Sequence, residues 1–270
     1  MTLIVSWIGV DSRKISSLYV ASDSRISWSN RATFDNGRKV FGCKNHPVII
    51  GYCGDVMFPS MVISQLVDLA DNGLLFADNS SNVERFERFY EKLQVQFASY
   101  PSEKSGVGVS SFEILFGSRD NETDFFCRKL KWTKSSDTWT EEDLPFSMYS
   151  DKLFIMGSGR AEFLSRYNEF QKSNESKTSR AVFQCLCETL ENMKDNYCGG
   201  APQLVGLYNR YNSKQFGIIH QNKRYLHGIE LNNSDDYNRV EWRNKLFEIC
   251  DGTTKEIKSD AQRQPRSWAR

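Results

Sequence analysis

Thr2 carries two groups that can act together in catalysis: a hydroxyl and, once the preceding residue is removed, a free α-amino group. The sequence begins Met1-Thr2, and because threonine has a small side chain we expect the initiator methionine to be removed. The hydroxyl would then be a nucleophile with a base on the same residue. An ordinary α-amino group titrates at about 7.7 to 8.0, so a small shift makes it a base near neutral pH.

Asp23 and Lys39 are the residues that we expect beside Thr2, as a buried ion pair. Both belong to short motifs at the ends of expected strands, where side chains converge on sites. A lysine ammonium near the Thr2 amine lowers the pKa of that amine, because like charges repel. The alternative interpretation is a surface ion pair with no part in chemistry.

Apolar patterns predict the elements that position these residues. Strands are expected at 2–9, 18–22, 48–52, 110–117, 124–132, 152–156, 202–208 and 215–219, the first two as a hairpin. Helices are expected at 55–75, 82–98, 160–171 and 180–194. Asp55 is placed to cap or charge the start of the first helix, and the acidic stretch 141–143 is typical of a solvated loop. This order predicts an α+β fold in which a sheet sandwich has helices on its outer faces.

Composition excludes several classes of function. The 270 residues are 39% hydrophobic and 26% charged, which is typical of a soluble globular protein. A net charge of +1 argues against nucleic acid or an anionic membrane as partner. No apolar stretch reaches the roughly 20 residues of a membrane helix, and no signal peptide is apparent, so we expect a cytoplasmic protein.

Neither a metal nor another cofactor is expected. The cysteines lack CxxC spacing and the three histidines are not spaced as metal ligands. The scattered cysteines therefore predict no disulfide framework, and most are expected to be small buried apolar residues.

Five motifs in register, over roughly residues 2–219, resemble the proteasome-type β subunits among the N-terminal nucleophile hydrolases. Ala21-Ser22-Asp23-Ser24-Arg25 resembles the family's catalytic-aspartate strand end, and Lys39 follows Asp23 by the family's 16 positions. Gly51-Tyr52-Cys53-Gly54-Asp55 is similar to its glycine turn, and Gly157-Ser158-Gly159 to its serine-bearing turn. Asp195-Asn196-Tyr197-Cys198-Gly199-Gly200 resembles its Asp-x-x-Ser-Gly-Gly signature, with cysteine for serine. The pattern is especially similar to stand-alone bacterial members, such as Anbu and the peptidase of the two-component ATP-dependent protease.

The resemblance implies a four-layer αββα sandwich over residues 1–222, with 223–270 as a C-terminal extension that is partly packed and ends in a flexible tail. It implies a threonine peptidase in which Thr2 Oγ attacks a peptide carbonyl and the Thr2 amine is the base. Lys39 would tune the local electrostatics, and Asp23 would hold Lys39 charged and oriented. The resemblance implies that the backbone N–H of Gly51 stabilises the oxyanion. It also implies three hydrogen-bond partners of the Thr2 amine: Ser158, Asp195 and Cys198. Structural roles remain the alternative, with Ser158 as a helix cap and the glycines as turn formers.

The resemblance also places an apolar specificity pocket on five residues: Ile26, Phe41, Ile49, Cys53 and Met57. Ser27 would pair with the extended backbone of the substrate, while Phe41 and Ile49 can alternatively be core residues. Rings, or another homo-oligomer, and an unfoldase partner that supplies unfolded chains are implied as well. A small-molecule amidase or acyltransferase of the same fold, or an inactive ring-forming subunit, are the alternative functions.

Overall fold

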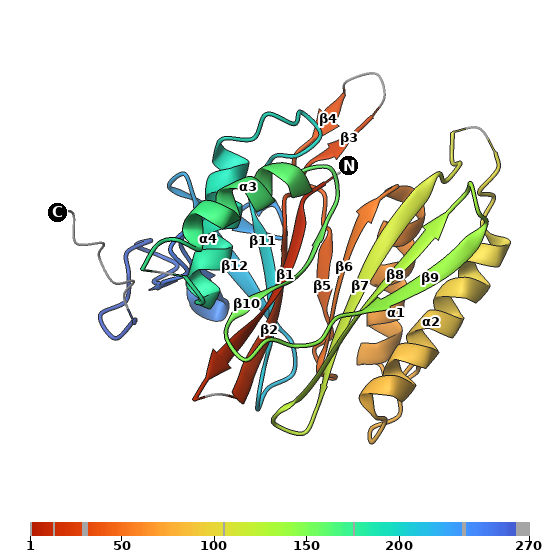
Figure 1. Cartoon of the computed structure of the whole chain (residues 1–270), viewed down its shortest axis with the longest axis horizontal. Helices are drawn as coiled ribbons and strands as arrows, with labels where there is room; N and C mark the ends of the chain where they lie inside the picture. Colours follow the sequence, from red (N-terminus) through yellow and green to blue (C-terminus); the bar gives the residue numbers. More distant parts are fainter. Residues whose placement is uncertain are drawn as a thin grey trace.

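The computed structural model describes residues 2–12, 14–28, 32–104, 106–174, 176–233 and 236–262. Met1, whose removal the sequence predicts, lies outside these residues, as do residues 263–270 of the expected flexible tail. Within the described ranges the chain combines helices with antiparallel sheets, which confirms the expected α+β class (Figure 1).

The larger sheet is built on the expected N-terminal hairpin. Its main path is β10 (Asp151–Met156), β1 (Ile4–Asp11), β2 (Lys14–Ser22), β11 (Gln203–Tyr208), β12 (Lys214–His220), β13 (Lys223–Leu226) and β14 (Ile229–Glu230). Neighbours along this path are antiparallel. β15 (Glu241–Arg243) adds in parallel to β12, and β16 (Ile249–Cys250) pairs with β15. The hairpin therefore lies well inside the sheet, with β1 between β10 and β2.

The smaller sheet has the strand order β5 (Val40–Gly42), β6 (Val48–Gly54), β7 (Ser111–Asp120), β8 (Asp124–Thr133) and β9 (Thr138–Asp143). The expectation of a solvated loop at 141–143 is wrong, because these residues belong to β9. Arg128 on β8 donates to both carboxylate oxygens of Asp143 at 2.7 Å, and Lys129 pairs with Glu142. Opposite charges across the strands explain why an acidic stretch is extended here. A separate short ribbon joins β3 (Ile26–Ser27) and β4 (Thr33–Phe34).

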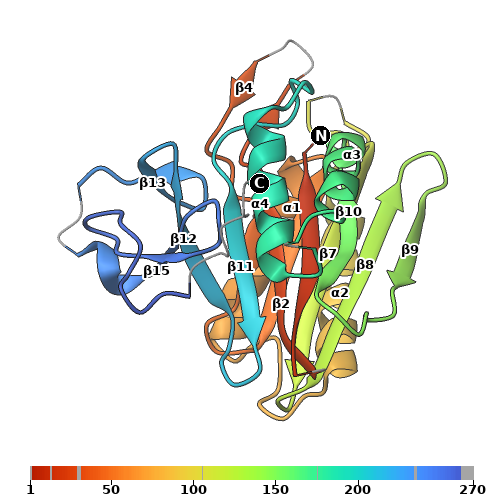
Figure 2. The ribbon, with the colours of Figure 1, turned by 60° about the vertical axis from the view of Figure 1, so that its left-hand side comes forward.

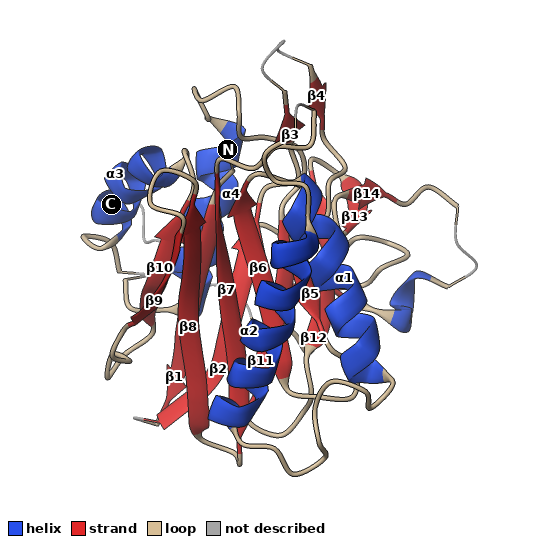
Figure 3. Ribbon diagram, turned by 90° about the vertical axis from the view of Figure 1, so that its right-hand side faces the viewer, coloured by secondary structure: helices blue, strands red, loops and turns tan. Residues whose placement is uncertain are grey.

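Two pairs of helices cover the outer faces of the sheets (Figures 1 and 3). α1 (Met57–Asp71) and α2 (Asn82–Ser99) pack on the smaller sheet, and α3 (Arg160–Phe170) and α4 (Ser179–Glu191) pack on the larger one. α2 begins with a capping box between Ser81 and Glu84. A short 3₁₀ helix spans Tyr237–Arg239. In the described part of the chain, none of the helices has the length and apolar character needed to cross a membrane.

Asp55 does not cap α1, in contrast to the expectation. Its carboxylate instead accepts the N–H groups of Ser110 and Ser111 at 2.7 Å, and α1 starts after Val56 without a side-chain cap. Asp55 thus fastens the end of β6 to the beginning of β7.

Strand alternation divides the apolar residues among separate cores. On β6, Ile50 and Tyr52 face α1 and α2, while Ile49 and Cys53 face the larger sheet. On β1, Val5 and Trp7 face α3 and α4, while Ile4 and Ile8 face the smaller sheet. The layers are therefore helix, sheet, sheet and helix, with one core between each pair of neighbouring layers.

The C-terminal extension completes the larger sheet (Figure 2). Phe247 is 6% exposed and packs in the core with Trp7 and Tyr19. β12 and β13 pair across residue 222, so the expected boundary at that residue falls inside a continuous sheet. The extension therefore shares its core with the rest of the chain.

Replacing Phe247 by alanine tests this shared core. We expect the free energy of unfolding to fall by about 3 to 5 kcal/mol, because a large aromatic ring leaves a cavity, and urea denaturation measures the change. Ile229→Ala is the control in the same extension, since Ile229 is 55% exposed, and its effect should stay within about 0.5 kcal/mol. Equal stability of the two variants would contradict the prediction.

Candidate active site

Thr2 is buried at the end of the space between the two sheets. Its side chain continues the alternation of Ile4 and Ile8, which both face the smaller sheet. The loop after β10 closes over it, since the Gly159 N–H donates to the Thr2 carbonyl at 3.3 Å. Gly157 has φ +90°, and a Cβ there would lie 2.0 Å from the Thr2 carbonyl oxygen. Only glycine fits at that position.

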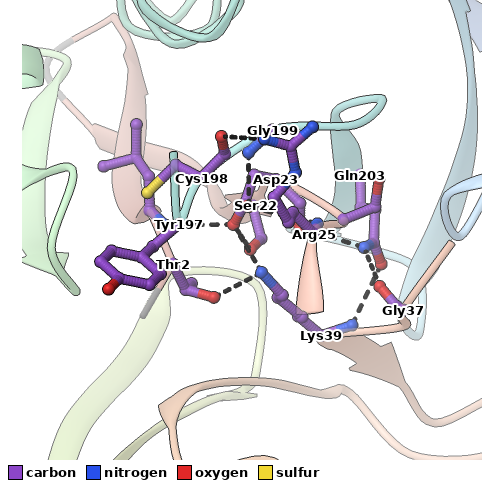
Figure 4. Close-up of polar contacts among 12 residues, drawn as sticks. Thr2, Ser22, Asp23, Arg25, Gly37, Lys39, Tyr197, Cys198, Gly199 and Gln203 are labelled. Carbon is purple, nitrogen blue, oxygen red and sulfur yellow. Dashed lines mark hydrogen bonds and ion pairs between the residues drawn. The ribbon is translucent and has the colours of Figure 1, made fainter. Parts of the chain in front are cut away.

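Lys39 connects Thr2 to Asp23 (Figure 4). The Lys39 ammonium donates to Thr2 Oγ1, and also to Asp23 Oδ1 at 2.8 Å. The side chains of Lys39 and Asp23 are 1% and 0% exposed. The expected buried pair beside Thr2 is thus present, and the alternative of a surface pair is wrong.

The carboxylate of Asp23 has further donors that compensate for its burial. The N–H of Leu3 donates to Oδ1 at 3.1 Å, and the N–H groups of Arg25 and Gly199 donate to Oδ2 at 3.2 and 3.0 Å. A buried ion pair is tolerated when such bonds satisfy the remaining lone pairs. Asp23 therefore fixes both the lysine and the backbone on either side of it.

Ser158, Cys198 and Asp195 form a second chain of contacts. Cys198 Sγ lies 3.6 Å from Ser158 Oγ and donates to Asp195 Oδ2 at 3.5 Å. Burial, followed by the charge of Asp23, raises the pKa of the Cys198 thiol to about 12. The side chain is therefore a protonated, weak donor at neutral pH.

The two chains of contacts are linked through Gly199. Gly199, next to Cys198, donates to Asp23, and a Cβ at Gly159 would lie 3.0 Å from Leu3 Cβ and 3.1 Å from Cys198 Sγ.

Ser158 does not cap a helix, because α3 begins after Gly159 without a side-chain cap. Sequence reasoning missed Glu162, whose carboxylate on α3 accepts the N–H of Asp195 at 3.1 Å.

Gly51 lies in the middle of β6, between β5 and β7. Successive N–H groups of a strand point alternately to its two neighbours. The Tyr52 N–H donates to the Lys39 carbonyl on the β5 side at 3.1 Å, so the Gly51 N–H faces β7. A Cβ at Gly51 would lie 2.8 Å from Val20 Cγ1, so this glycine permits close packing of the sheets. Its N–H is thus directed away from Thr2, because the motif forms a strand rather than a turn.

Gly54 is the last residue of β6. Its N–H points to the same side as that of Tyr52, whereas the next residue, Asp55, donates to Ser111 on the β7 side at 2.9 Å. β5 pairs with β6 only as far as Gly51, so β5 does not occupy this side at Gly54. The φ of +96°, and the 2.5 Å from an added Cβ to the Ser111 carbonyl oxygen, require glycine.

The residues expected to line a substrate pocket are spread over several surfaces: Ile26, Ser27, Phe41, Ile49, Cys53 and Met57. Phe41 is buried beneath α1 and α2, whereas Ile49 and Cys53 are buried between the sheets. Met57 is exposed at the start of α1. Ile26 and Ser27 form β3, and Ser27 Oγ donates to the Tyr197 carbonyl at 3.3 Å. The expected common pocket does not form, because alternation directs Phe41 and Ile49 to opposite faces of one sheet.

A cavity of about 850 Å³ opens beside Asp195 and Cys198. Arg25 and Asp35 form part of its wall, and Tyr225, Ile229 and Glu230 of the C-terminal extension form another part. Arg25 donates to both carboxylate oxygens of Asp35, at 2.7 and 2.9 Å, which lowers the pKa of Asp35. A second cavity, of about 800 Å³, lies between the loop at 73–80 and α2 and includes none of the candidate residues.

Two further observations concern metals and disulfides. Among the residues that the structure describes, no group of three or more His, Cys, Asp or Glu side chains could hold a metal ion. Cys43, Cys53, Cys127, Cys185, Cys187, Cys198 and Cys250 are all free and buried.

Gln203 was not singled out by the sequence, yet it lies within the site (Figure 4). Its Oε1 accepts the Lys39 N–H at 3.2 Å, and its Nε2 donates to the carbonyls of Asp23 and Gly37 at 3.1 and 2.6 Å. The available signal was an uncharged polar residue at the start of an otherwise apolar strand, Gln203–Tyr208.

The buried ion pair can be tested without any assay of activity. We expect Lys39→Met and Asp23→Asn each to lower the free energy of unfolding by about 3 kcal/mol, because each leaves a buried partner uncompensated. The double variant should lose less than the sum of the two, and urea denaturation of all four proteins gives the coupling. Glu91→Gln is the control, since the Arg88–Glu91 pair is 64% and 60% exposed. Strictly additive effects would show that Lys39 and Asp23 do not interact.

Comparisons with known proteins do not assign the chain to a family. No family model matches it, and a search of curated proteins finds no significant match. The interpretation of the site therefore rests on its geometry and on the motifs in the sequence.

Proposed function

We propose that the chain is a threonine peptidase of the N-terminal nucleophile type, with a proteasome-like fold. The order of layers, helix, sheet, sheet and helix, supports the four-layer αββα sandwich that this class has. The position of Thr2 supports it further, since Thr2 lies two residues before β1 and its side chain lies between the sheets.

One observation carries the proposal: the Lys39 ammonium is bonded to both Thr2 Oγ1 and Asp23 in a buried position. A cation that donates a hydrogen bond to a hydroxyl oxygen stabilises the negative charge that develops on that oxygen as its proton leaves. It also lowers the pKa of a nearby amine.

In the proposed reaction, removal of Met1 frees the Thr2 amine. This amine takes the proton of Thr2 Oγ as the oxygen attacks the carbonyl carbon of a peptide bond, and then gives the proton to the leaving amine. The product is an ester between Thr2 and the acyl part of the substrate. Water, deprotonated by the same amine, hydrolyses that ester and restores Thr2.

The oxyanion formed in each half of the reaction needs a donor. We assign this role to the N–H of Gly54 in place of Gly51, because the Gly54 N–H points to the side where Lys39 lies. One such donor contributes roughly 3 to 4 kcal/mol in comparable acyl-transfer sites. In this proposal Ser158, Cys198 and Asp195 would bond the amine and orient it.

Ser27 on β3 remains the candidate to pair with an extended peptide backbone. The residues expected to form an apolar pocket are largely buried, and the cavity beside Cys198 has charged walls. This observation favours, as a second candidate, hydrolysis of a small polar amide by the same residues.

The assembly belongs to the same proposal. A ring or another homo-oligomer and an unfoldase that supplies unfolded chains follow from the resemblance alone, and a cytoplasmic location belongs to the proposal as well. If Met1 stays attached, the Thr2 nitrogen is an amide and cannot act as base, and an inactive ring-forming subunit becomes the better interpretation.

Substitution of Thr2 tests the nucleophile. We expect Thr2→Ala to abolish cleavage of a short peptide joined to a fluorogenic amine, and Thr2→Ser to keep part of the activity, because serine retains the hydroxyl. Intact-mass measurement of the wild-type protein should show that Met1 has been removed. Equal cleavage by the alanine and serine variants would exclude Thr2 as the nucleophile.

Substitution of Cys198 tests the second chain of contacts. We expect Cys198→Ser to raise kcat by about fivefold, since a hydroxyl is a stronger donor than a thiol and one hydrogen bond contributes about 1 kcal/mol. Burial raises the pKa of the Cys198 thiol to about 12. The thiol thus stays protonated between about pH 6 and pH 10 and adds no ionisation there to the kcat profile. A Cys198→Ala variant with higher kcat than Cys198→Ser would contradict a donor role.

A further inference from the structure

We infer that Gln203 is a positioning residue that holds Lys39 and Asp23 in the arrangement that Thr2 requires. The inference rests on the function proposed above and extends it to a residue on a strand, β11, that carries none of the expected catalytic groups. The carboxamide of Gln203 bonds three backbone groups from two segments, at Asp23 and at 37–39, and each segment carries one member of the ion pair.

Backbone groups of the protein occupy both the acceptor and the donor of the Gln203 carboxamide. Oε1 accepts from the Lys39 N–H at 3.2 Å, and Nε2 donates to the carbonyls of Asp23 and Gly37 at 3.1 and 2.6 Å. A carboxamide offers one acceptor oxygen and two N–H donors, and this site uses both kinds. A carboxylate has no donor, and an apolar side chain has neither group. Glutamine therefore fits these three backbone groups by its chemistry as well as its length.

Lys39 depends on this contact because it lies just before β5. The Lys39 carbonyl accepts the Tyr52 N–H at 3.1 Å. The Lys39 N–H, in contrast, donates to the side chain of Gln203 and not to the backbone of a neighbouring strand. The Lys39 side chain must reach Thr2 and Asp23 together. A backbone shift of about 1 Å at such a residue is enough to lower catalysis by about 100-fold.

The C-terminal extension encloses the same point. Gln203 is 1% exposed. The turn between β13 and β14 contains Gly228, with φ +83°, where a Cβ would lie 2.6 Å from Ser24 Cβ and 3.5 Å from Gln203 Nε2. The extension thus restricts water at the carboxamide, and a lost protein contact is not readily replaced by solvent.

Gln215 on the neighbouring strand β12 supplies a matched control. It also joins the larger sheet to the β5 segment, since its Nε2 donates to the Gly42 carbonyl at 3.0 Å. Its Oε1 lies 2.7 Å from His227 Nε2. It holds neither Asp23 nor Lys39, so its substitution removes bonds of the same kind without affecting the ion pair.

The experiment compares Gln203→Met with Gln215→Met in the full chain. Thermal unfolding first shows that both variants fold, and Gln203→Glu, which keeps the length and the acceptor, replaces Gln203→Met if the latter does not. Two readouts follow: kcat and KM for the fluorogenic peptide, and the rate of Thr2 acylation by a β-lactone, measured by intact mass. A β-lactone opens when the hydroxyl attacks its carbonyl, so the adduct reports the nucleophile directly.

We expect Gln203→Met to lower kcat and the acylation rate by about 100-fold, with KM changed by less than about threefold. Gln215→Met should change all three by less than about threefold, although it loses comparable hydrogen bonds. A Gln203→Met variant with the kcat of Gln215→Met would overturn the inference while leaving the proposed function intact.

Failure of the proposed function gives a different result. In that case the wild-type protein itself would show no adduct on Thr2. A crystal structure of Gln203→Met then decides the positioning role separately, by the separation of Lys39 Nζ and Asp23 Oδ1. Displacement of the lysine supports the role, and the unchanged 2.8 Å of the wild type would overturn it.

Discussion

A lysine and an aspartate buried together, between two sheets and beside a threonine hydroxyl, form the interaction on which the arrangement of this site depends. Neither charge would be stable there alone, because removing a charged group from water is strongly unfavourable. The structure compensates for this with donors from three separate segments, the residues at 3, 25 and 199, all bonded to one carboxylate. The pair thus fixes the relative positions of β1, β2, β5 and the loop before β11. The contacts that place Lys39 beside Thr2 also stabilise the two buried charges.

The close approach of the two sheets is the second constraint. Gly51 lets Val20 of the opposite sheet approach β6, and Gly157 lets the loop after β10 approach the Thr2 backbone. Each glycine is required because another chain segment occupies the space of a side chain. Together they explain how Thr2 on one sheet comes within reach of Lys39 at the edge of the other.

The C-terminal extension provides a third set of contacts that support the site. It continues the larger sheet through β12, inserts Phe247 into the core beneath α4, and places the turn with Gly228 over Ser24 and Gln203. It also forms one wall of the cavity beside Cys198. Residues that are distant in the sequence therefore enclose the same region from several sides.

The sequence by itself determined the α+β class, the ranges of the four helices within a few residues, the N-terminal hairpin and the association of Thr2 with Asp23 and Lys39. These follow from local apolar periodicity and from motifs at strand ends, and both can be recognised from the order of the residues alone. The acidic β9 was missed because its charges are compensated by the neighbouring strand. The direction of the Gly51 N–H could not be read from the sequence, because it depends on which strands lie on either side of β6. Only the tertiary structure decided that Phe41 and Ile49 face opposite cores and that Gln203 joins the segments that carry Asp23 and Lys39, because such contacts depend on which residues of distant strands meet.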